Sequence, residues 1–257
     1  MSDRALFCRV VLVGAIAGFT SGLFGVGGGI VIVPTLVIIA GFEQRLAHGT
    51  SLGAIILISA TGTIGYGTEG EVQWAAAAAM VAGGLVGTIA GTSLLQRVSQ
   101  PKLQAGFAFL LVATAIRMLI STPDAAEVPS LSGWTALGYV VLGFTAGLLA
   151  GLMGVGGGII TVPALTVLAG FPLVVAKGTS LAVIVPSAIV GTLRNRSKHN
   201  VDLRASVTVG VAGIATAYVA SKISLELDPD LSARLFAALL VVTALRMANT
   251  VRKNWAD

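Results

Sequence analysis

One sequence block occurs twice in this chain of 257 residues. The first copy, GLFGVGGGIVIVP, ends at Pro34 and the second, GLMGVGGGIITVP, ends at Pro163, so the offset is 163 − 34 = 129 residues. Between residues 18–54 and 147–183, 20 of 37 aligned pairs are identical without a gap. A repeat of this length predicts that the chain is built from two copies of one structural unit. The predicted parts are a first repeat at residues 1–119, a linker at 120–133 and a second repeat at 134–257.

The composition excludes an ordinary soluble domain. Charged residues make up only 11% of the chain, whereas a soluble domain carries about 25%. Long apolar segments, separated by polar or turn residues, predict an all-α polytopic membrane protein whose surroundings are the lipid bilayer. In the first half these segments are about 7–24, 27–41, 47–66, 73–96 and 102–119; in the second they are about 134–153, 156–171, 176–194, 203–223 and 231–249.

The net charge of +5 reflects membrane topology rather than nucleic-acid binding, because no basic stripe with interleaved aromatic residues is present. If the N-terminus is cytoplasmic, the acidic loops and the linker fall outside, and the basic loop 194–204 and the C-terminal tail fall inside. This arrangement requires an odd number of crossings in each half. The two halves are therefore expected to form an inverted repeat, with both termini in the cytoplasm and the linker outside.

The second segment of each half is too short for a simple span. Residues 27–41 would form about 22 Å of helix, against about 30 Å of hydrocarbon. Two alternatives remain open for this segment and for its counterpart at 156–171. Each is either a shielded short span or one half of a hairpin that enters the membrane and returns.

A glycine run precedes each short segment. Glycine costs about 1 kcal/mol in a helix interior and permits positive φ, so each run predicts a break in the backbone. The helix that follows would present free N–H groups at its positive end, which favours an anion. The alternative is that the glycines only permit close helix packing. The candidate substrate-binding glycines are Gly25, Gly27, Gly28 and Gly29 in the first half and Gly154, Gly156, Gly157 and Gly158 in the second.

A second repeated motif begins the third segment of each half: His-Gly-Thr-Ser at 48–51 and Lys-Gly-Thr-Ser at 177–180. Hydroxyl residues at the head of an apolar run are typical helix N-caps. The same hydroxyls, beside a positive side chain, also suit a small oxyanion, so both alternatives stand. The candidate residues are His48, Gly49, Thr50 and Ser51 in the first half and Lys177, Gly178, Thr179 and Ser180 in the second. Arg117 and Arg246, at matching places late in the fifth segments, either contact the substrate or extend to the membrane surface.

Acidic residues are missing from the apolar segments, since all 11 lie in gaps or at segment ends. Proton and sodium pathways usually depend on buried carboxylates, so this interior favours an anion. No catalytic triad, metal-ligand cluster or phosphate-binding loop is present, and Cys8 is the single cysteine. We therefore expect a protein without cofactor or metal that is not an enzyme; a membrane enzyme acting on lipids is the alternative.

The duplicated block Gly-Leu-x-Gly-Val-Gly-Gly-Gly-x-x-x-Val-Pro-x-Leu, followed by Gly-Thr-Ser-Leu, resembles the sulfite exporter TauE/SafE family over nearly the whole chain. The resemblance implies transport of sulfur-containing anions, such as sulfite and organosulfonates, across the bacterial inner membrane. The family motifs map onto residues 25–29, Pro34 and 49–51, and onto their counterparts 154–158, Pro163 and 178–180. The two halves differ in charge at one motif position, where the first half has His48 and the second has Lys177.

The leading hypothesis is an anion permease, an exporter that works by alternating access between two inverted repeats. Its substrate site would lie between the glycine runs and the Gly-Thr-Ser motifs. The alternatives are an importer, a permease for another small anion, and a membrane scaffold that transports nothing. The sequence does not indicate the oligomeric state or the identity of the anion.

Overall fold

The computed structural model describes residues 3–94, 111–113, 115–116, 132–153 and 156–254, and these residues form helices joined by short loops. The prediction of an all-α protein is confirmed. In chain order the helices are α1 (Asp3–Phe24), α2 (Gly29–Ala40), α3 (Gln44–Gly67), α4 (Trp74–Leu94), α6 (Gly133–Met153), α7 (Gly158–Val167), α8 (Leu173–Arg196), α9 (Leu203–Glu226) and α10 (Pro229–Asn254). The predicted fifth segment, about 102–119, lies mostly outside the described residues.

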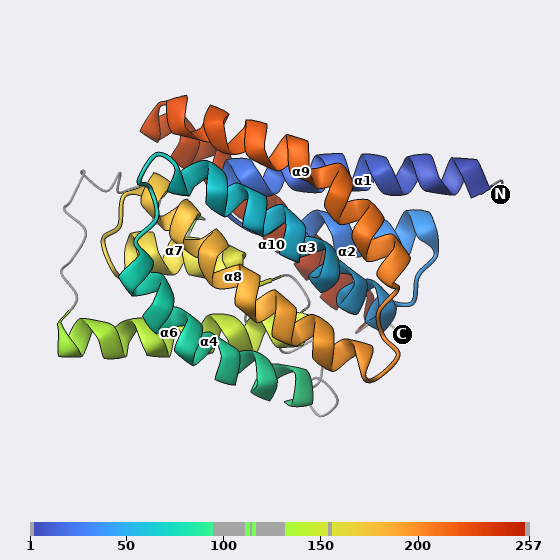
Figure 1. Cartoon of the computed structure of the whole chain (residues 1–257), viewed down its shortest axis with the longest axis horizontal. Helices are drawn as coiled ribbons and strands as arrows, with labels where there is room; N and C mark the ends of the chain where they lie inside the picture. Colours follow the sequence, from blue (N-terminus) through green and yellow to red (C-terminus); the bar gives the residue numbers. More distant parts are fainter. Residues whose placement is uncertain (1–2, 95–110, 114, 117–131, 154–155, 255–257) are drawn as a thin grey trace.

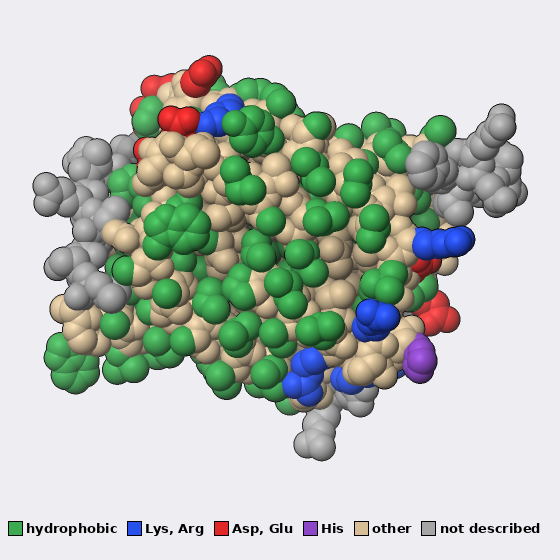
Figure 2. Space-filling view, viewed as in Figure 1, with side chains coloured by type: hydrophobic (Ala, Val, Ile, Leu, Met, Phe, Trp, Pro, Cys, Tyr) green, Lys and Arg blue, Asp and Glu red, His purple; other side chains and the backbone are tan. Residues whose placement is uncertain are grey.

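Five helices within the described residues, α3, α4, α6, α8 and α9, are long and apolar enough to cross a membrane. Large apolar side chains on them point outward; Ile64 and Leu193, for example, are each 60% exposed. Figure 2 shows hydrophobic side chains covering the middle of one face and charged side chains gathered toward its ends. A surface of this kind is stable against lipid rather than water, so the chain is a multi-pass membrane protein.

The helices α2 and α7 are as short as the sequence predicts. They contain 12 and 10 residues, about 18 and 15 Å of helix, and each has a proline inside it, Pro34 or Pro163. Their placement in the membrane, as short spans or as halves of re-entrant hairpins, stays a prediction.

The helices pair across the two halves of the chain. Helices α3 and α8 contact one another in the middle of the bundle, while α1 packs on α9 and α4 packs on α6 (Figure 1). Each of these pairs takes one helix from each half. The offset of 129 residues relates α1 to α6 and α4 to α9, so the two outer pairs are equivalent.

The central pair is antiparallel and its contacts are reciprocal. Gly62, late in α3, faces Leu181, early in α8, and the equivalent pair is Gly191 and Leu52. An approximate twofold axis between the halves would produce this arrangement. It supports the expectation of an inverted repeat, whose orientation in the membrane stays a prediction.

Glycines allow the outer pairs to approach backbone to backbone. In α1, Gly14, Gly18 and Gly22 recur every fourth residue and face α9; a Cβ atom on Gly18 would lie 2.2 Å from the carbonyl oxygen of Gly213. The α4–α6 pair repeats this pattern, and a Cβ atom on Gly87 would lie 2.1 Å from the carbonyl oxygen of Phe144. Close backbone approach through small residues is the usual way in which membrane helices associate.

This packing predicts different effects for two glycines of α6. A Cβ atom on Gly143 would lie 2.0 Å from the carbonyl oxygen of Met80, whereas Gly138 has no atom within 4 Å of that position. Gly143→Ala should lower the free energy of unfolding by about 1–3 kcal/mol through overpacking. Gly138→Ala should be neutral, or stabilising by up to about 1 kcal/mol. Unfolding in detergent measures both, and equal effects would contradict the packing.

Candidate functional site

The predicted backbone breaks are present. In the first glycine break (residues 25–28), Gly25, Gly27 and Gly28 have φ values of +71°, +77° and +77°, a conformation that other residues rarely adopt. In the second glycine break (residues 154–157), Gly156 and Gly157 have φ values of +82° and +80°. Gly154 lies outside the described residues. Gly28 and Gly157 are the N-caps of α2 and α7, so each break leads directly into a short helix.

The two glycine breaks meet at the central helix pair. A Cβ atom on Gly158 would lie 2.7 Å from the Cα atom of Val26, so the start of α7 touches the first break. Gly27 and Gly156 both lie against Ile55 of α3 and Ile184 of α8, which are equivalent residues of the two halves. The N-termini of α2 and α7 therefore converge on one place in the bundle.

Each of these helix N-termini has free N–H groups. The first helical hydrogen bonds run from Val31 N to Gly28 O and from Ile160 N to Gly157 O, both 3.0 Å. The N–H groups of residues 29–30 and 158–159 come before these bonds. They have no intrahelical acceptor, because the helix has no turn ahead of them. The positive end of the helix dipole lies at the same point, so the pair of N-termini suits a negative charge without a charged side chain.

Hydroxyl groups satisfy the carbonyls that α1 leaves free at the first break. Tyr66 donates a hydrogen bond to Gly22 O at 2.7 Å, Ser224 to Leu23 O at 3.0 Å and Ser180 to Gly25 O at 2.9 Å. All three donors are fully buried. Because an unpaired carbonyl in an apolar interior costs several kcal/mol, these bonds are what allow α1 to end inside the bundle.

The two Gly-Thr-Ser motifs are not helix caps, so that alternative is wrong. Helices α3 and α8 begin at Gln44 and Leu173, and their N-caps are Glu43 and Pro172, which make no side-chain cap bond. The motifs lie in the second turn, where the helix uses the backbone N–H groups itself. A role of the motifs in binding an anion stays a prediction, and it would rest on their side chains rather than on these N–H groups.

Each Gly-Thr pair instead holds a loop from the other half. Thr50 Oγ1 accepts a hydrogen bond from Asp202 N, and Thr179 Oγ1 accepts one from Gln73 N, both at 3.0 Å. The neighbouring glycines make room for these loops: a Cβ atom on Gly49 would lie 2.0 Å from Asn200 O, and one on Gly178 would lie 2.2 Å from Glu71 O. The serines differ, because Ser180 bonds the first break whereas Ser51 is fully buried without a hydrogen-bond partner.

Lys177 is a buried lysine. Its side chain is 0% exposed, and its ammonium group donates hydrogen bonds to Ser224 Oγ at 2.9 Å and to Ser232 Oγ at 2.6 Å. Among the described residues no carboxylate pairs with it. In its charged form the amine has three donors, so one donor and the charge would be without a partner among the described residues. The negative end of α1 is near, since Ser224 also bonds Leu23 O, and it offsets part of the burial cost.

The other predicted cations are placed differently. His48, the counterpart of Lys177, is half-buried in α3. Arg246 is exposed on α10, so the structure does not place it among the buried groups of the breaks. Arg117 lies outside the described residues.

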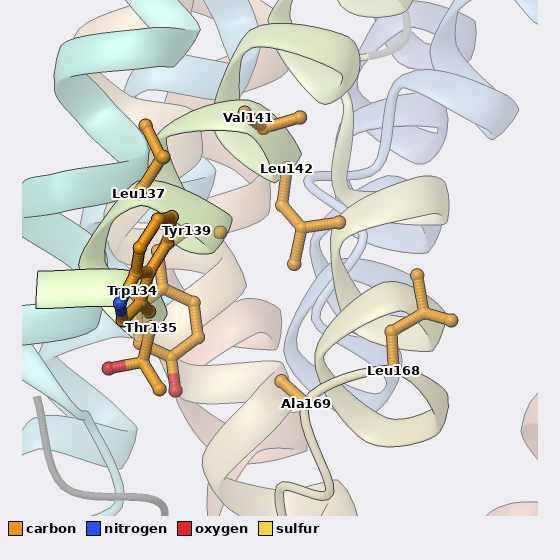
Figure 3. Close-up of a pocket in the computed structure, with 9 residues that line it drawn as sticks. Trp134, Thr135, Leu137, Tyr139, Val141, Leu142, Leu168 and Ala169 are labelled. Atoms are coloured by element: carbon orange, nitrogen blue, oxygen red, sulfur yellow. The ribbon is translucent and has the colours of Figure 1, made fainter. Parts of the chain in front are cut away.

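The described cavities are lateral and apolar. One of about 610 Å³ lies between α6 and α7, and the side chains that line it include Trp134, Leu142 and Leu168 (Figure 3). Another of about 520 Å³ continues along the same helices past Ile160 and Val167. Neither contains a predicted site residue, and linings of this kind suit hydrocarbon rather than an anion.

A sequence profile described as "Sulfite exporter TauE/SafE" matches residues 10–247. The chain belongs to the TauE/SafE family. It is 27% identical over 220 residues to the "Probable membrane transporter protein YunE" of Bacillus subtilis (strain 168), with 76% of this chain and 80% of that protein covered. It is 27% identical over 257 residues to a "Probable membrane transporter protein" of Xylella fastidiosa (strain 9a5c), with 95% and 94% covered. No solved structure gives a significant match.

The protein is therefore a membrane transporter of the TauE/SafE family. A protein named a probable membrane transporter in Haemophilus influenzae is 35% identical over 164 residues, which is 61% of each chain. The names of these relatives state transport across a membrane and no substrate.

Two side chains beside Lys177 in this TauE/SafE member escape a search for repeated motifs. Ser224 and Ser232, which hold Lys177, stand opposite Leu95 and Leu103 in the first half of the sequence. Their hydroxyls therefore carry no repeat signal. Only the fold, which brings the ends of α9 and α10 to α8, reveals them.

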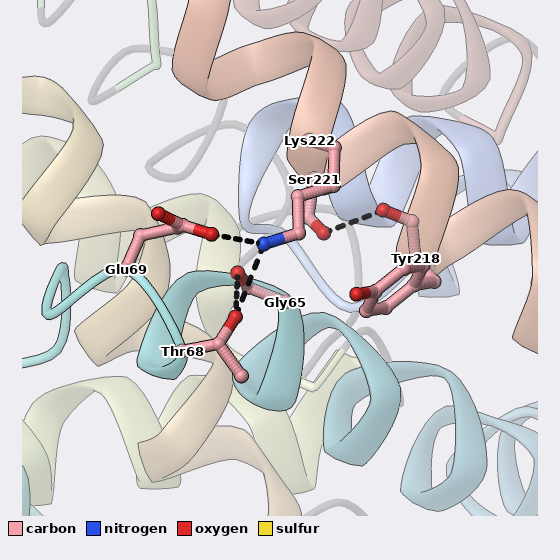
Figure 4. A network of polar contacts seen from close by, with 6 residues as sticks. All are labelled: Gly65, Thr68, Glu69, Tyr218, Ser221 and Lys222. Carbon is pink, nitrogen blue, oxygen red and sulfur yellow. Dashed lines mark hydrogen bonds and ion pairs between the residues drawn. The ribbon is translucent and has the colours of Figure 1, made fainter.

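An ion pair joins the two halves on the side of the bundle where α3 and α9 end. Lys222 pairs with Glu69 and donates a hydrogen bond to Thr68 Oγ1 at 3.1 Å (Figure 4). Tyr218 lies beneath the ammonium group, with the ring centre 5.6 Å away. Lys222 thus has a carboxylate partner, in contrast to Lys177.

The reciprocal loop contacts predict matched losses of stability. Thr50→Val and Thr179→Val each leave one loop N–H group without its acceptor, which should cost about 1–3 kcal/mol apiece. The contacts lie at opposite ends of the α3–α8 pair, so the double variant should lose the sum. Thr145→Val is the control, because that exposed hydroxyl bonds only Leu142 O on its own helix. Unfolding in detergent measures all four proteins, and a silent Thr50→Val would contradict the assignment.

Proposed function

We propose that this TauE/SafE transporter exports a small sulfur-containing anion, such as sulfite or an organosulfonate, across the bacterial inner membrane, with both termini in the cytoplasm. The observation that carries the proposal is the convergence of the α2 and α7 N-termini on Ile55 and Ile184. Two positive helix ends from opposite halves face one place, and such a pair favours a negative ligand over a cation or a neutral solute.

The uncompensated charge of Lys177 supports the same assignment. Its backbone lies against the first break, since a Cβ atom on Gly25 would be 2.6 Å from Lys177 Cα. Its ammonium group is held by hydroxyls alone, which leaves the charge available to balance an anion that enters the site. A carboxylate partner would have cancelled that charge before any substrate arrived.

Transport would proceed by alternating access between the two halves. Helices α3 and α8 make equivalent contacts at the two ends of their pair. A movement that opens the bundle at one end would therefore have an equivalent movement that opens it at the other end. For a monoanion leaving the cell, an inside-negative potential contributes about 2.3 kcal/mol per 100 mV. Outward uniport therefore needs no coupled ion, in keeping with apolar segments that contain no carboxylate. Import, another small anion and a non-transporting scaffold are the outcomes that the experiments below would reveal instead.

Lys177→Met should abolish the response to anions while leaving the protein folded. Sulfite, methanesulfonate, sulfate, acetate and chloride are added to the purified protein, and thermal unfolding is followed. A ligand at a hundredfold excess over its Kd stabilises the native state by about 2.7 kcal/mol. We expect a selective stabilisation by sulfite or methanesulfonate that Lys177→Met loses and Lys222→Met keeps, because Lys222 already has its carboxylate. Loss in both variants would point to net charge rather than a site.

Flux measurements separate a transporter from a scaffold. In proteoliposomes loaded with sulfite, an inside-negative potential should accelerate efflux without movement of protons. Gly28→Val should stop the flux in a protein that still folds, because a Cβ atom there would lie 2.7 Å from Ala17 O and φ is +77°. Gly41→Ala is the control, since it has a similar φ of +68° and no atom within 4 Å. Substrate-dependent proton flux would refute uniport. Equal efflux from liposomes that contain no protein would refute transport.

A further inference from the structure

One buried hydroxyl beside the glycine breaks has no partner in the protein. Ser59 of α3 is 0% exposed, and its Oγ atom makes no hydrogen bond. It lies 3.3 Å from the position of a Cβ atom on Gly27, as close as the side chains of Ile55 and Ile184. Buried polar groups are nearly always paired, so an unpaired one at a candidate site requires an explanation.

Ser59 differs from the other hydroxyls of its own helix. Thr61 and Thr63 lie further along the same helix, and each donates a hydrogen bond to a carbonyl one turn back. Thr61 bonds Leu57 O at 2.9 Å, and Thr63 bonds Ser59 O at 2.8 Å. Serine in a helix readily makes the same local bond. The hydroxyl of Ser59 is instead directed to the first break, whose backbone leads through Gly28 into the N-terminus of α2.

The second half lacks this hydroxyl. The residue equivalent to Ser59 is Ala188, which is also fully buried, in α8. Ser21, a second unpaired hydroxyl near the end of α1, likewise corresponds to Ala150. The two half-sites therefore share their glycine backbone, yet at these two pairs of equivalent positions only the first half carries a hydroxyl.

We propose that Ser59 donates a hydrogen bond to an oxygen of the transported anion, which the N-terminus of α2 holds at the first break. The oxyanion group binds on the α2 side, and the remainder of the substrate lies toward α7 and Ala188. This orientation favours an anion with one oxyanion group and one less polar end, such as an alkanesulfonate. The inference rests on the proposed function and adds to it a substrate orientation and a specificity-determining residue.

The test compares Ser59→Ala with the wild-type protein in sulfite and methanesulfonate titrations followed by thermal unfolding. We expect the apparent affinity for both anions to fall about tenfold or more, which corresponds to about 1.4 kcal/mol for a hydrogen bond to a charged group. Without anion, the variant should melt at the same temperature or slightly higher, because an unpaired buried hydroxyl has been removed. Thr61→Ala is the control on the same helix and should bind as the wild type does.

The orientation has a separate test in Ala188→Ser. A hydroxyl on the α7 side should reduce affinity for methanesulfonate relative to sulfite, since it would face the methyl group. An equal change for both anions would overturn the orientation.

The outcomes distinguish the inference from the function beneath it. If the wild-type protein binds these anions and Ser59→Ala binds them equally well, the hydroxyl holds water only and the inference is wrong, while the proposed function stands. If the wild-type protein responds to neither anion, the proposed function fails and the inference fails with it. Should Ser59→Ala not fold, Ser59→Cys decides the question, because a thiol keeps the shape of serine but donates only weakly.

Discussion

The whole arrangement depends on satisfying backbone polar groups where helices end inside an apolar bundle. Helix α1 stops at Phe24, and the carbonyls it leaves free at Gly22, Leu23 and Gly25 would each be costly without a partner. Tyr66, Ser180 and Ser224 supply the partners, and they come from α3, α8 and α9. The break therefore ties three helices from both halves to one point. The interior polar groups largely allow the helices to break, and the N–H groups that the same breaks expose are the basis of the proposed anion site.

Much of the fold follows from the sequence, because segment length and polarity are strong signals in a membrane protein. The repeat predicted two similar halves, and the glycine runs predicted breaks that positive φ values at Gly27 and Gly156 confirm. The starts of α3 and α8 were harder to place. In α3 the first turn, residues 44–47, is only partly apolar, so the sequence pattern places the head of this helix too late, at the Gly-Thr-Ser motif.

The candidate site was only partly predictable, since its parts are brought together by tertiary structure. Repetition identified Lys177 and the glycines, but it missed Ser224 and Ser232, which have no counterpart hydroxyls. It also missed the partners of Thr50 and Thr179, because a hydroxyl that bonds a loop of the other half carries no local signature. The two halves share a backbone design, whereas their buried side chains have diverged. Divergence of this kind would allow a symmetric frame to hold an asymmetric ligand.

Each Gly-Thr pair contacts a loop of the other half, and this exchange of contacts bears on the ancestry of the chain. Neither half is complete by itself: alone, it would expose the glycine stripe of α1 or α6 and leave Thr50 or Thr179 without a loop to hold. Two identical halves could supply these contacts to each other only if one ran antiparallel to the other, as α3 does to α8. If the two halves also lie in opposite senses in the membrane, an undivided ancestor of this architecture would have been a homodimer of copies inserted both ways. Fusion would then have fixed one copy in each orientation and freed the two to differ.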